Sequence, residues 1–235
     1  MRHLAIIPAR SGSKSLPDKN ILPLNGKPLL AWSIDTAQQS GMFDTIHVST
    51  DSEQYAEIAR KYGADVPFLR SAAASSDTAS SWLAVLEALE KYGDIGKHFD
   101  TIALLQPTSP LRTPEDIRNA YRVMEERNAQ AIVSVCETEQ YPLWCNTLPE
   151  NGCMNQFLPP AEEDLPRQAM PLYYQINGAI YLLSVKALQK HGQVAYDQDC
   201  YAYVMPRERS IDIDEAVDFA VAEFLLCQSA AYKNG

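Results

Sequence analysis

The first stretch of the sequence that could do chemistry is a small-residue, basic loop near the N-terminus. It follows an apolar run at residues 4–7, which is typical of a buried strand and ends at Pro8. The loop contains Arg10, Ser11, Gly12, Ser13, Lys14, Lys19 and Asn20. Small side chains let backbone N–H groups approach phosphate oxygens, and the cations neutralise their charge. An ordinary surface loop can have the same composition, so the residues alone leave both interpretations open.

A second candidate is a pair of carboxylates near the C-terminus, Asp212 and Asp214, separated by one apolar residue. In an extended backbone, residues two apart point to the same side, with Cα atoms ~7 Å apart. Two carboxylates so placed suit a hard divalent cation that takes further ligands from water and phosphate. The same residues suit a helix start, with Asp214 as N-cap and Glu215 in the first turn.

Two further polar stretches follow apolar runs. Residues 106–112 offer the amide of Gln106, the hydroxyls of Thr108 and Ser109, and a guanidinium. These groups could hold a polyhydroxylated acid, or they could form a helix entry with an incidental arginine. Residues 75–78 suit a helix cap, which accounts for Asp77 but leaves Arg70 unexplained.

Histidine and cysteine offer no alternative chemistry. The four histidines lie in no catalytic motif, and His47 falls in a strand-like run, where a packed or surface role is expected. The five cysteines form no C-x-x-C pair and no metal-ligand spacing. Free thiols in a reducing cytoplasm are therefore expected.

Strand-like and helical patterns alternate along the chain. Apolar or β-branched runs occupy residues 4–7, 45–50, 101–105, 131–135, 178–183 and 201–205. Helical patterns occupy residues 28–41, 53–62, 78–92, 114–127 and 215–227, with a short one from 185. This alternation predicts a three-layer α/β fold, a mostly parallel Rossmann-like sheet with helices on both faces. Ligands bind such sheets beyond the carboxyl ends of the strands, which groups the polar stretches into one site.

The alternation fails over residues 137–175. This segment has no convincing periodicity and is long for a loop in a compact domain, which marks it as functional, intermolecular or mobile. Its apolar residues have no periodic element on which to be buried. We therefore expect one domain spanning residues 1–235, with residues 137–175 inserted as a dimerisation and substrate-pocket segment.

Composition excludes several classes of partner. The net charge of −10 argues against general binding to nucleic acid or to an anionic membrane surface. No apolar stretch approaches the ~20 residues needed to span a bilayer, and no N-terminal targeting signal is visible. An anionic substrate must therefore be attracted by a local basic patch.

Several stretches together resemble the CMP-sialic acid synthetase (acylneuraminate cytidylyltransferase) family. They are A-R-S-G-S-K-x-L-P-D-K-N from residue 9, L-L-Q-P-T-S-P-L-R from 104, R-Q at 167, N-G-A-I-Y from 177 and S-I-D-I-D from 210. The resemblance runs from residue 4 to about residue 223, nearly the whole chain, and these stretches occur in it in this order. The resemblance implies transfer of CMP from CTP to the anomeric hydroxyl of N-acetylneuraminate, with release of pyrophosphate. It also implies a cytoplasmic homodimer that requires Mg²⁺ or Mn²⁺.

The resemblance also implies residue roles. Lys19, Arg10, Asp212 and Asp214 would be catalytic, and the two aspartates would hold the metal. The nucleotide would be bound by Arg10, Ser11, Gly12, Ser13, Lys14, Lys19, Asn20, Arg70, Asp77 and Ser80. The acid would be bound by Gln106, Thr108, Ser109, Trp144, Arg167, Gln175, Asn177 and Tyr181, with Arg167 pairing with the carboxylate, unless it forms a surface salt bridge.

Two departures concern the acid. Sialate-activating relatives often carry basic residues where this chain has Trp144 and Gln175. An alternative is therefore activation of a related nonulosonic acid, legionaminate or pseudaminate. An alternative of another class is a non-catalytic nucleotide-binding regulator, against which the Asp212/Asp214 pair argues because a sensor needs no metal.

Overall fold

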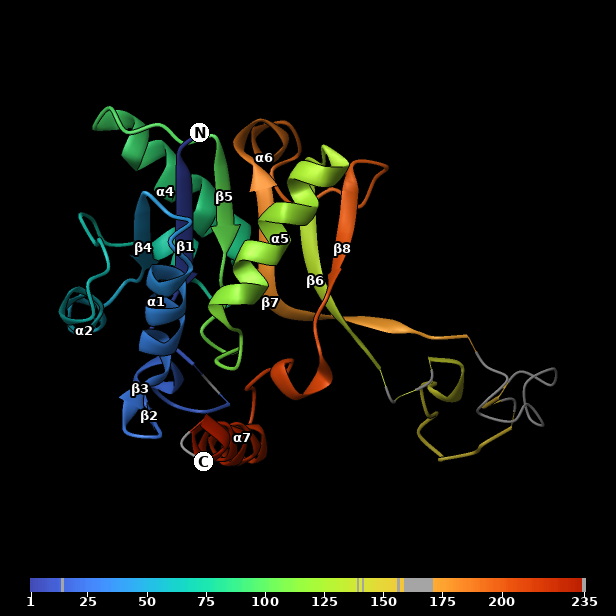
Figure 1. Cartoon of the computed structure of the whole chain (residues 1–235). Helices are drawn as coiled ribbons and strands as arrows, with labels where there is room; N and C mark the ends of the chain where they lie inside the picture. Colours follow the sequence, from blue (N-terminus) through green and yellow to red (C-terminus); the bar gives the residue numbers. More distant parts are fainter. Residues whose placement is uncertain (14, 139, 141, 156, 159–170, 234–235) are drawn as a thin grey trace.

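A six-stranded sheet runs through the computed structural model of the chain (Figure 1). The structure describes residues 1–13, 15–138, 140, 142–155, 157–158 and 171–233. The strands, in their order across the sheet, are β4 (Thr45–Ser49), β1 (His3–Pro8), β5 (Thr101–Leu104), β7 (Tyr174–Ser184), β6 (Ala131–Glu137) and β8 (Cys200–Val204). Parallel pairs join β1 to β4 and β5, and β6 to β8. The predicted mostly parallel α/β sheet is confirmed.

The strand predicted at residues 178–183 differs from the others in direction. As β7 it begins earlier, at Tyr174, and runs antiparallel to both of its neighbours, β5 and β6. A parallel neighbour needs a crossover, usually through a helix on a face of the sheet. The chain instead leaves β6 and returns through the irregular segment of residues 137–175, so β7 enters the sheet from the opposite end.

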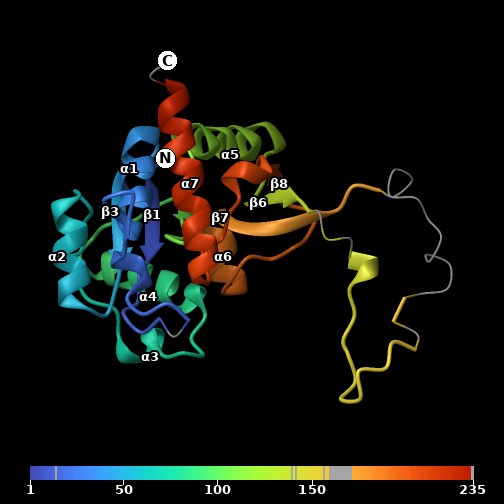
Figure 2. The same cartoon turned by 90° about the horizontal axis from the view of Figure 1, so that it is seen from below.

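Helices cover both faces of the sheet, as predicted. They are α1 (Leu29–Ser40), α2 (Glu53–Lys61), α3 (Ala72–Ser75), α4 (Ser81–Asp94), α5 (Pro114–Arg127), α6 (Val185–His191) and α7 (Ala216–Lys233). Figure 2 shows α1 and α5 on one side of the strands, and α4 and α6 on the other. Successive residues of β1 serve the two layers, because side chains alternate along a strand. Ile7 packs in the cluster that contains residues of α1, α2 and α5, whereas Ile6 packs with Val85 of α4 and Leu188 of α6.

Helix starts follow the capping residues of the sequence, with two corrections. Thr113 and Asp116 form the capping box of α5, with Pro114 at its first position, as predicted. The helix expected to follow a cap at residues 75–78 instead begins at Ser81, where Ser80 is the N-cap, and the short α3 precedes it. A serine-rich stretch offers several possible caps, and Asp77 is engaged elsewhere. Likewise α1 begins after Pro28, which pairs with Pro23 in a small hairpin of β2 (Pro23–Leu24) and β3 (Lys27–Pro28).

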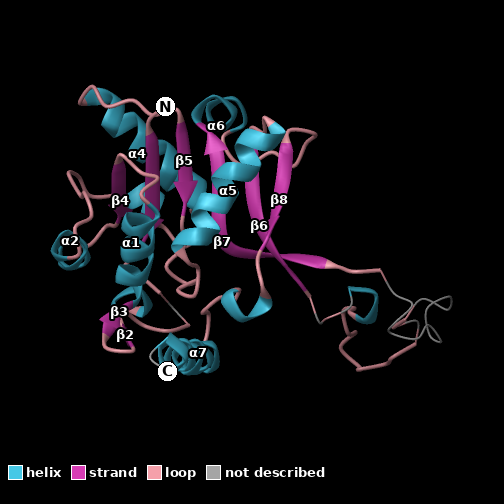
Figure 3. Cartoon of the chain, in the orientation of Figure 1, coloured by secondary structure: helices cyan, strands magenta, loops and turns pink. Residues whose placement is uncertain are grey.

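Beyond the body of the sheet, β6 and β7 continue as a two-stranded ribbon to the pair formed by Glu137 and Tyr174. In Figure 3 this ribbon and the described residues that follow it extend away from the helices. They include one short 3₁₀ turn, η2 (Pro142–Trp144), and lie mostly exposed. We call the described part of residues 137–175 the arm.

Candidate active site

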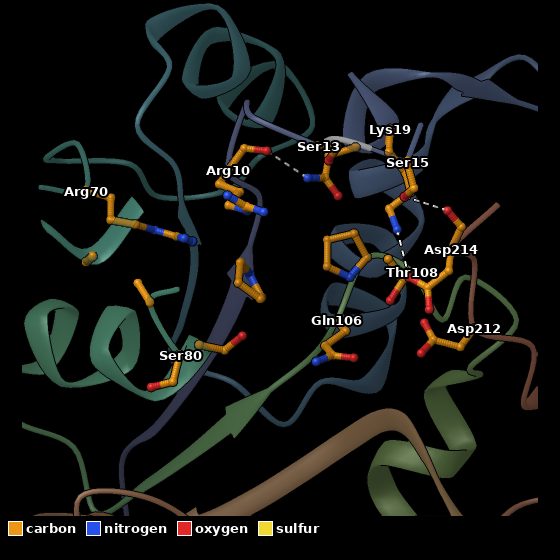
Figure 4. Close-up of a pocket in the computed structure, with 16 residues that line it drawn as sticks. Arg10, Ser13, Ser15, Lys19, Arg70, Ser80, Gln106, Thr108, Asp212 and Asp214 are labelled. Carbon is orange, nitrogen blue, oxygen red and sulfur yellow. Dashed lines mark hydrogen bonds and ion pairs between the residues drawn. The ribbon is translucent and has the colours of Figure 1, made fainter. Parts of the chain in front are cut away.

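A pocket of about 510 Å³ lies at the carboxyl ends of β1 and β5 (Figure 4). It is lined by Pro8, Arg10, Ser13, Ser15, Lys19, Asn20, Arg70, Ala74, Ala79, Ser80, Ser81, Gln106, Pro107, Thr108, Asp212 and Asp214. The alternation of strands and helices predicted that the polar stretches would group at this edge of the sheet. A larger cavity, about 800 Å³, lies at the opposite edge among residues such as Leu86, Phe99 and Met124, and none of the predicted site residues that the structure describes lines it.

The basic loop after β1 is held by acidic residues from neighbouring elements. The backbone N–H and the hydroxyl of Ser11 both donate to Asp51, which follows β4, at 2.9 and 3.1 Å. Arg10 pairs with Asp77 at 2.6 Å, and Asn20 donates to the Arg10 carbonyl at 3.1 Å. Arg10, Ser13 and Asn20 reach the pocket lining, whereas Ser11, Gly12 and Asp77 do not. Lys14 lies outside the described residues.

Lys19 connects this loop to the C-terminal aspartates. It lies in the 3₁₀ turn η1 (Lys19–Ile21) and is only 8% exposed. Its ammonium group donates to the Ile213 carbonyl at 2.6 Å and lies 3.2 Å from Asp214 Oδ1. The Ser15 hydroxyl donates to the Asp214 carbonyl at 2.9 Å. Two segments from opposite ends of the sequence are thus joined on one wall of the pocket.

The two aspartates lie on the opposite side of the chain from the residue between them, as the spacing predicts for an extended backbone. Ile213 between them is fully buried against Leu24, Leu29 and Ala222, whereas both carboxylates remain exposed on the pocket side. The Ile213 N–H donates to the Thr108 carbonyl at 2.8 Å, which fixes the segment beside the loop after β5. Alternation of side chains along extended backbone therefore places both carboxylates at the pocket.

The electrostatic environment of Asp212 opposes its charge. Burial raises its pKa and the charge of Asp214 adds to the rise, while a hydrogen bond from Thr108 and the charge of Lys19 oppose it. Asp212 keeps solvent contact, but protein atoms displace much of the surrounding water in the concave site.

A Cβ on Gly178 (φ +72°) would lie 2.5 Å from Gln106 Oε1 and 3.7 Å from Asp212 Oδ2. Only glycine allows this close approach.

The helix-start interpretation of Asp214 is wrong. The helix α7 begins at Ala216, one position too late for Asp214 to be its N-cap, and Asp218 in its first turn accepts from the backbone N–H groups of Asp214 and Glu215 at 3.0 and 2.8 Å. The side chain of Asp214 contacts Lys19 and faces the pocket. The helix therefore does not need the carboxylate of Asp214 as its cap.

Arg70 and Ser80 form the opposite wall of the pocket. The Arg70 guanidinium donates to the hydroxyl and the carbonyl of Ser49 at 2.9 and 2.5 Å. Burial lowers the Arg70 pKa to about 10, so the group stays cationic at neutral pH. Ser80 lies at the start of α4, with Ala79 and Ser81 beside it on the lining. This wall combines a half-buried cation with small side chains.

The loop after β5 contributes only part of its predicted set. Gln106 and Thr108 line the pocket, whereas Ser109 is fully buried and its hydroxyl donates to the Asn177 carbonyl at 3.3 Å. Arg112 is also buried, and it donates to the Ala179 carbonyl and the Ser33 hydroxyl, both at 2.6 Å. Burial lowers the Arg112 pKa to about 10. Through these hydrogen bonds the Arg112 guanidinium holds the loop after β5 in place, and it does not line the pocket.

The remaining residues predicted to bind the acid do not line the pocket where the structure describes them. Asn177 is buried and Tyr181 is half-buried against Trp82, with ring centroids 5.7 Å apart. Trp144 and Gln175 lie on the arm. Arg167 lies outside the described residues.

No histidine or cysteine is among the described residues that line the pocket. His47 is buried against Tyr92 and Phe68, and burial lowers its pKa to about 4. All five cysteines are free thiols, as expected. Within the described residues, no helix is both long and apolar enough to cross a membrane.

Comparison with known families identifies the chain. The sequence profile described as cytidylyltransferase matches residues 4–232. The chain belongs to the cytidylyltransferase family. This membership favours nucleotidyl transfer over a non-catalytic regulator, and it agrees with a pocket that combines cations and a carboxylate pair.

Curated relatives refine the placement of this cytidylyltransferase. A CMP-N,N'-diacetyllegionaminic acid synthase of Legionella pneumophila is 39% identical, over 96% of this chain and 97% of its own. An N-acylneuraminate cytidylyltransferase of Streptococcus agalactiae is 40% identical over 93% of this chain, which spans about half of that relative. A pseudaminic acid cytidylyltransferase of Campylobacter jejuni is 34% identical over 96% of both chains. The resemblance to CMP-sialic acid synthetases is confirmed, and the chain is a nucleotidyltransferase.

Solved structures confirm the cytidylyltransferase fold. A CMP:2-keto-3-deoxy-manno-octonic acid synthetase complexed with CTP superimposes with a TM-score of 0.73, over 97% of this chain and all of that one. The two sequences are 17% identical. At this identity the likeness concerns the arrangement of sheet and helices.

The donor set of the pocket fits a divalent cation that is shared with a substrate. In the described part of the chain, no group of three or more His, Cys, Asp or Glu side chains is placed to hold a metal. Asp212 and Asp214 supply carboxylate oxygens, the ligand type that Mg²⁺ and Mn²⁺ prefer. Their mutual repulsion, which contributes to the raised pKa of Asp212, would be relieved by a cation. Two carboxylates suit a metal that takes its other ligands from water and phosphate oxygens.

Proposed function

We propose that this cytidylyltransferase transfers CMP from CTP to the anomeric hydroxyl of N-acetylneuraminate and releases pyrophosphate. The observation that carries the proposal is the convergence of the basic loop after β1 and the Asp212/Asp214 pair on one pocket at the carboxyl ends of the strands. The relatives named as N-acylneuraminate cytidylyltransferases support the choice of acid.

The residues around the pocket suit an in-line displacement at the α-phosphorus. A bond forms between the anomeric oxygen and the α-phosphorus, the bond to the β-phosphate oxygen breaks, and pyrophosphate leaves with the electron pair. Arg10 and Lys19 would stabilise charge on the phosphate oxygens, together with Lys14 of the same loop. Asp212 and Asp214 are the only carboxylates on the described lining, so the hydroxyl proton would pass to water.

Asp212 and Asp214 would hold Mg²⁺ or Mn²⁺ beside Lys19. The cation would neutralise charge on the triphosphate while it is bound. The chain's own contribution is to orient these carboxylates, through the buried Ile213 and through the contacts of Thr108 and Ser15. Arg70, Ser80 and Asn20 would bind the nucleotide, and Gln106 and Thr108 would contact the acid.

A related acid is the second candidate. Two relatives that match along nearly their whole length are named for diacetyllegionaminic acid and for pseudaminic acid, which supports this alternative. Such acids replace a hydroxyl of the side-chain tail with a methyl group and carry a second N-acyl group. Trp144 would pack on the methyl group where a basic residue would bind hydroxyls, provided that an arm reaches the pocket.

We expect turnover of N-acetylneuraminate together with measurable turnover of a deoxy, di-N-acyl relative. An apolar wall rejects an added hydroxyl weakly, by ~10²-fold at most, so Trp144 should broaden the range of acids more than it switches the preference. Pyrophosphate release from CTP with each acid gives kcat/KM for the comparison, and omission of the acid is the control. Release with neither acid would refute the proposed acceptor. Release with the sialate alone would show that Trp144 does not contact the acid.

We also expect a homodimer assembled through the arm. Several apolar side chains of the arm, together with Ile176 of β7 next to it, are exposed: Trp144, Leu148, Met154, Leu172, Tyr174 and Ile176 range from 39 to 65% exposed. Such a surface usually marks an interface. A second copy would cover it and could bring Trp144 and Gln175, which lie away from the chain's own pocket, to the pocket of its partner.

Light scattering should therefore give twice the chain mass of 26.2 kDa at micromolar concentration. Leu148→Asp with Ile176→Asp should shift the mass toward the monomer, because two charges would be buried without partners. Substitution of Val217, an exposed apolar residue on α7 (63% exposed), with aspartate is the matched control and should leave the mass unchanged. A monomer mass for the unsubstituted chain would contradict the proposal.

A further inference from the structure

The segment that carries the two aspartates has an anchor outside the pocket. We call residues 207–214 the carboxylate loop; it begins with the 3₁₀ turn η4 (Arg207–Arg209), shortly after β8, and ends just before α7. Arg209 contacts both oxygens of Asp116, with Nε 3.1 Å from Oδ2 and Nη2 2.7 Å from Oδ1. A two-pronged arginine–carboxylate pair fixes direction as well as distance. We infer that Arg209 is a positioning residue, which holds the carboxylate loop so that Asp212 and Asp214 present one geometry to a cation.

Asp116 is a rigid partner for this contact. It lies in the first turn of α5, with its side chain 1% exposed. Its carboxylate also accepts from the backbone N–H and the hydroxyl of Thr113 at 2.8 and 2.7 Å, and from the Tyr203 hydroxyl at 2.9 Å. Burial alone would raise the pKa of Asp116, but hydrogen bonds from Arg209 and Thr113 outweigh burial and lower it. The carboxylate is therefore charged and fixed in place by α5 and β8.

The contact lies close to the aspartates along the chain. Arg209 precedes Asp212 by three residues, which span at most ~11 Å. Between them the Ser210 hydroxyl accepts from the Asn177 side chain at 2.8 Å, and the Asn177 oxygen accepts from Ser134 at 2.6 Å. The nitrogen and the oxygen of the Asn177 side-chain amide therefore both form hydrogen bonds within the protein, which explains why Asn177 lies away from the pocket. A displacement of η4 would be transmitted to Asp212 through this short segment.

The far end of the loop is held by different groups. The Ile213 N–H donates to Thr108, and its carbonyl accepts from Lys19, which itself belongs to the pocket. The Arg209–Asp116 pair is thus an ion pair that the carboxylate loop makes away from the pocket. Its side chains do not line the pocket, so substitutions there change the geometry without removing a ligand.

This inference rests on the proposed function, because it assumes that Asp212 and Asp214 bind a cation. Titration of the full chain with Mn²⁺, in the presence of CTP and without acid, followed by water-proton relaxation, measures the cation affinity apart from turnover. Arg209→Gln should raise the apparent Kd for Mn²⁺ on the order of tenfold, a size typical of lost support behind metal ligands. Arg209→Lys, which keeps a charge but loses one contact, should give an intermediate value.

Tyr203→Phe is the matched control. It removes one donor to Asp116 and leaves Arg209 in place, so the Kd for Mn²⁺ should stay within about twofold of the unsubstituted value. If Arg209→Gln lowers Tm and leaves the Kd unchanged, the pair only stabilises the fold and the inference is wrong. Should Arg209→Gln fail to fold, Arg209→Lys decides the same question.

Asp212→Asn in the same titration separates the two proposals. If it abolishes binding of Mn²⁺ to the protein while Arg209→Gln and Arg209→Lys bind normally, the positioning role fails and the metal site stands. If Asp212→Asn binds Mn²⁺ like the unsubstituted chain, the metal assignment fails and the positioning role fails with it.

Discussion

Substitution of Asp212 with asparagine is expected to lower kcat by roughly 10²-fold or more, and to leave Tm unchanged or slightly raised. The amide has nearly the shape of the carboxylate, and its oxygen can still accept from Thr108. Its loss of charge removes a ligand for a divalent cation. The environment of Asp212 raises its pKa, so the charge already costs stability in the folded state, and its removal should not destabilise the protein.

The measurement is kcat from pyrophosphate release across a Mg²⁺ titration, with Tm measured on the same samples. Glu223→Gln is the control, since this acidic residue of α7 accepts from Asn25 at 3.3 Å and does not line the pocket. It should change neither quantity by much. Activity of Asp212→Asn within tenfold of the unsubstituted enzyme, at the same Tm, would rule out a metal role for Asp212.

The part of the site that the sequence predicts best is the part that follows from backbone geometry. Asp212 and Asp214 face the pocket because Ile213 between them is buried, and this alternation is predicted by the spacing alone. The meeting of Lys19 with Asp214 follows from the rule that strand ends in a parallel sheet share one edge. The capping box at Thr113 is equally local, because its partners are three residues apart.

Predictions that depended on side-chain direction were less complete. Ser109, Asn177 and Arg112 lie in stretches that resemble the family's motifs, yet their side chains are buried. The Ser109 hydroxyl donates to the Asn177 carbonyl, and the Arg112 guanidinium donates to the Ala179 carbonyl. A motif letter does not say whether a residue faces a ligand or supports the residue that does. To distinguish a ligand-facing residue from a supporting one, the direction of each side chain must be known. For these residues that direction depends on the packing of β7 against β5.

The direction of β7 and the start of α4 also could not be predicted from residues that are neighbours in the sequence. An antiparallel strand inside a parallel sheet is set by where residues 137–175 leave and re-enter, and those residues have no periodicity to interpret. For α4, several serines were suitable caps, and the choice of Ser80 accompanies the ion pair of Asp77 with Arg10, a contact distant in sequence. Nothing in the sequence indicated that Ser15 would line the pocket, because it occupies the variable position x of the motif A-R-S-G-S-K-x-L-P-D-K-N.

Lys19 provides the second large expected effect: Lys19→Met should lower kcat on the order of 10²-fold, while KM for CTP rises much less. The ammonium group is nearly buried between the Ile213 carbonyl and Asp214, so it is preorganised and meets little competing water. A cation held in this way interacts more strongly as charge develops on the phosphate oxygens. A contact that strengthens in the transition state lowers kcat when it is removed.

Part of the loss could come from displacement of the carboxylate loop, since Lys19 also anchors the Ile213 carbonyl. Ser15→Ala controls for this, because it removes the other hydrogen bond between the two segments, from the Ser15 hydroxyl to the Asp214 carbonyl, without removing a charge. It should lower kcat by less than about tenfold, in keeping with a single neutral hydrogen bond. Steady-state kcat and KM for CTP, measured for both variants with Tm, distinguish the two effects. A Lys19→Met enzyme with a raised KM and an unchanged kcat would show that Lys19 only holds the bound nucleotide, and a Ser15→Ala enzyme as slow as Lys19→Met would assign the loss to loop displacement.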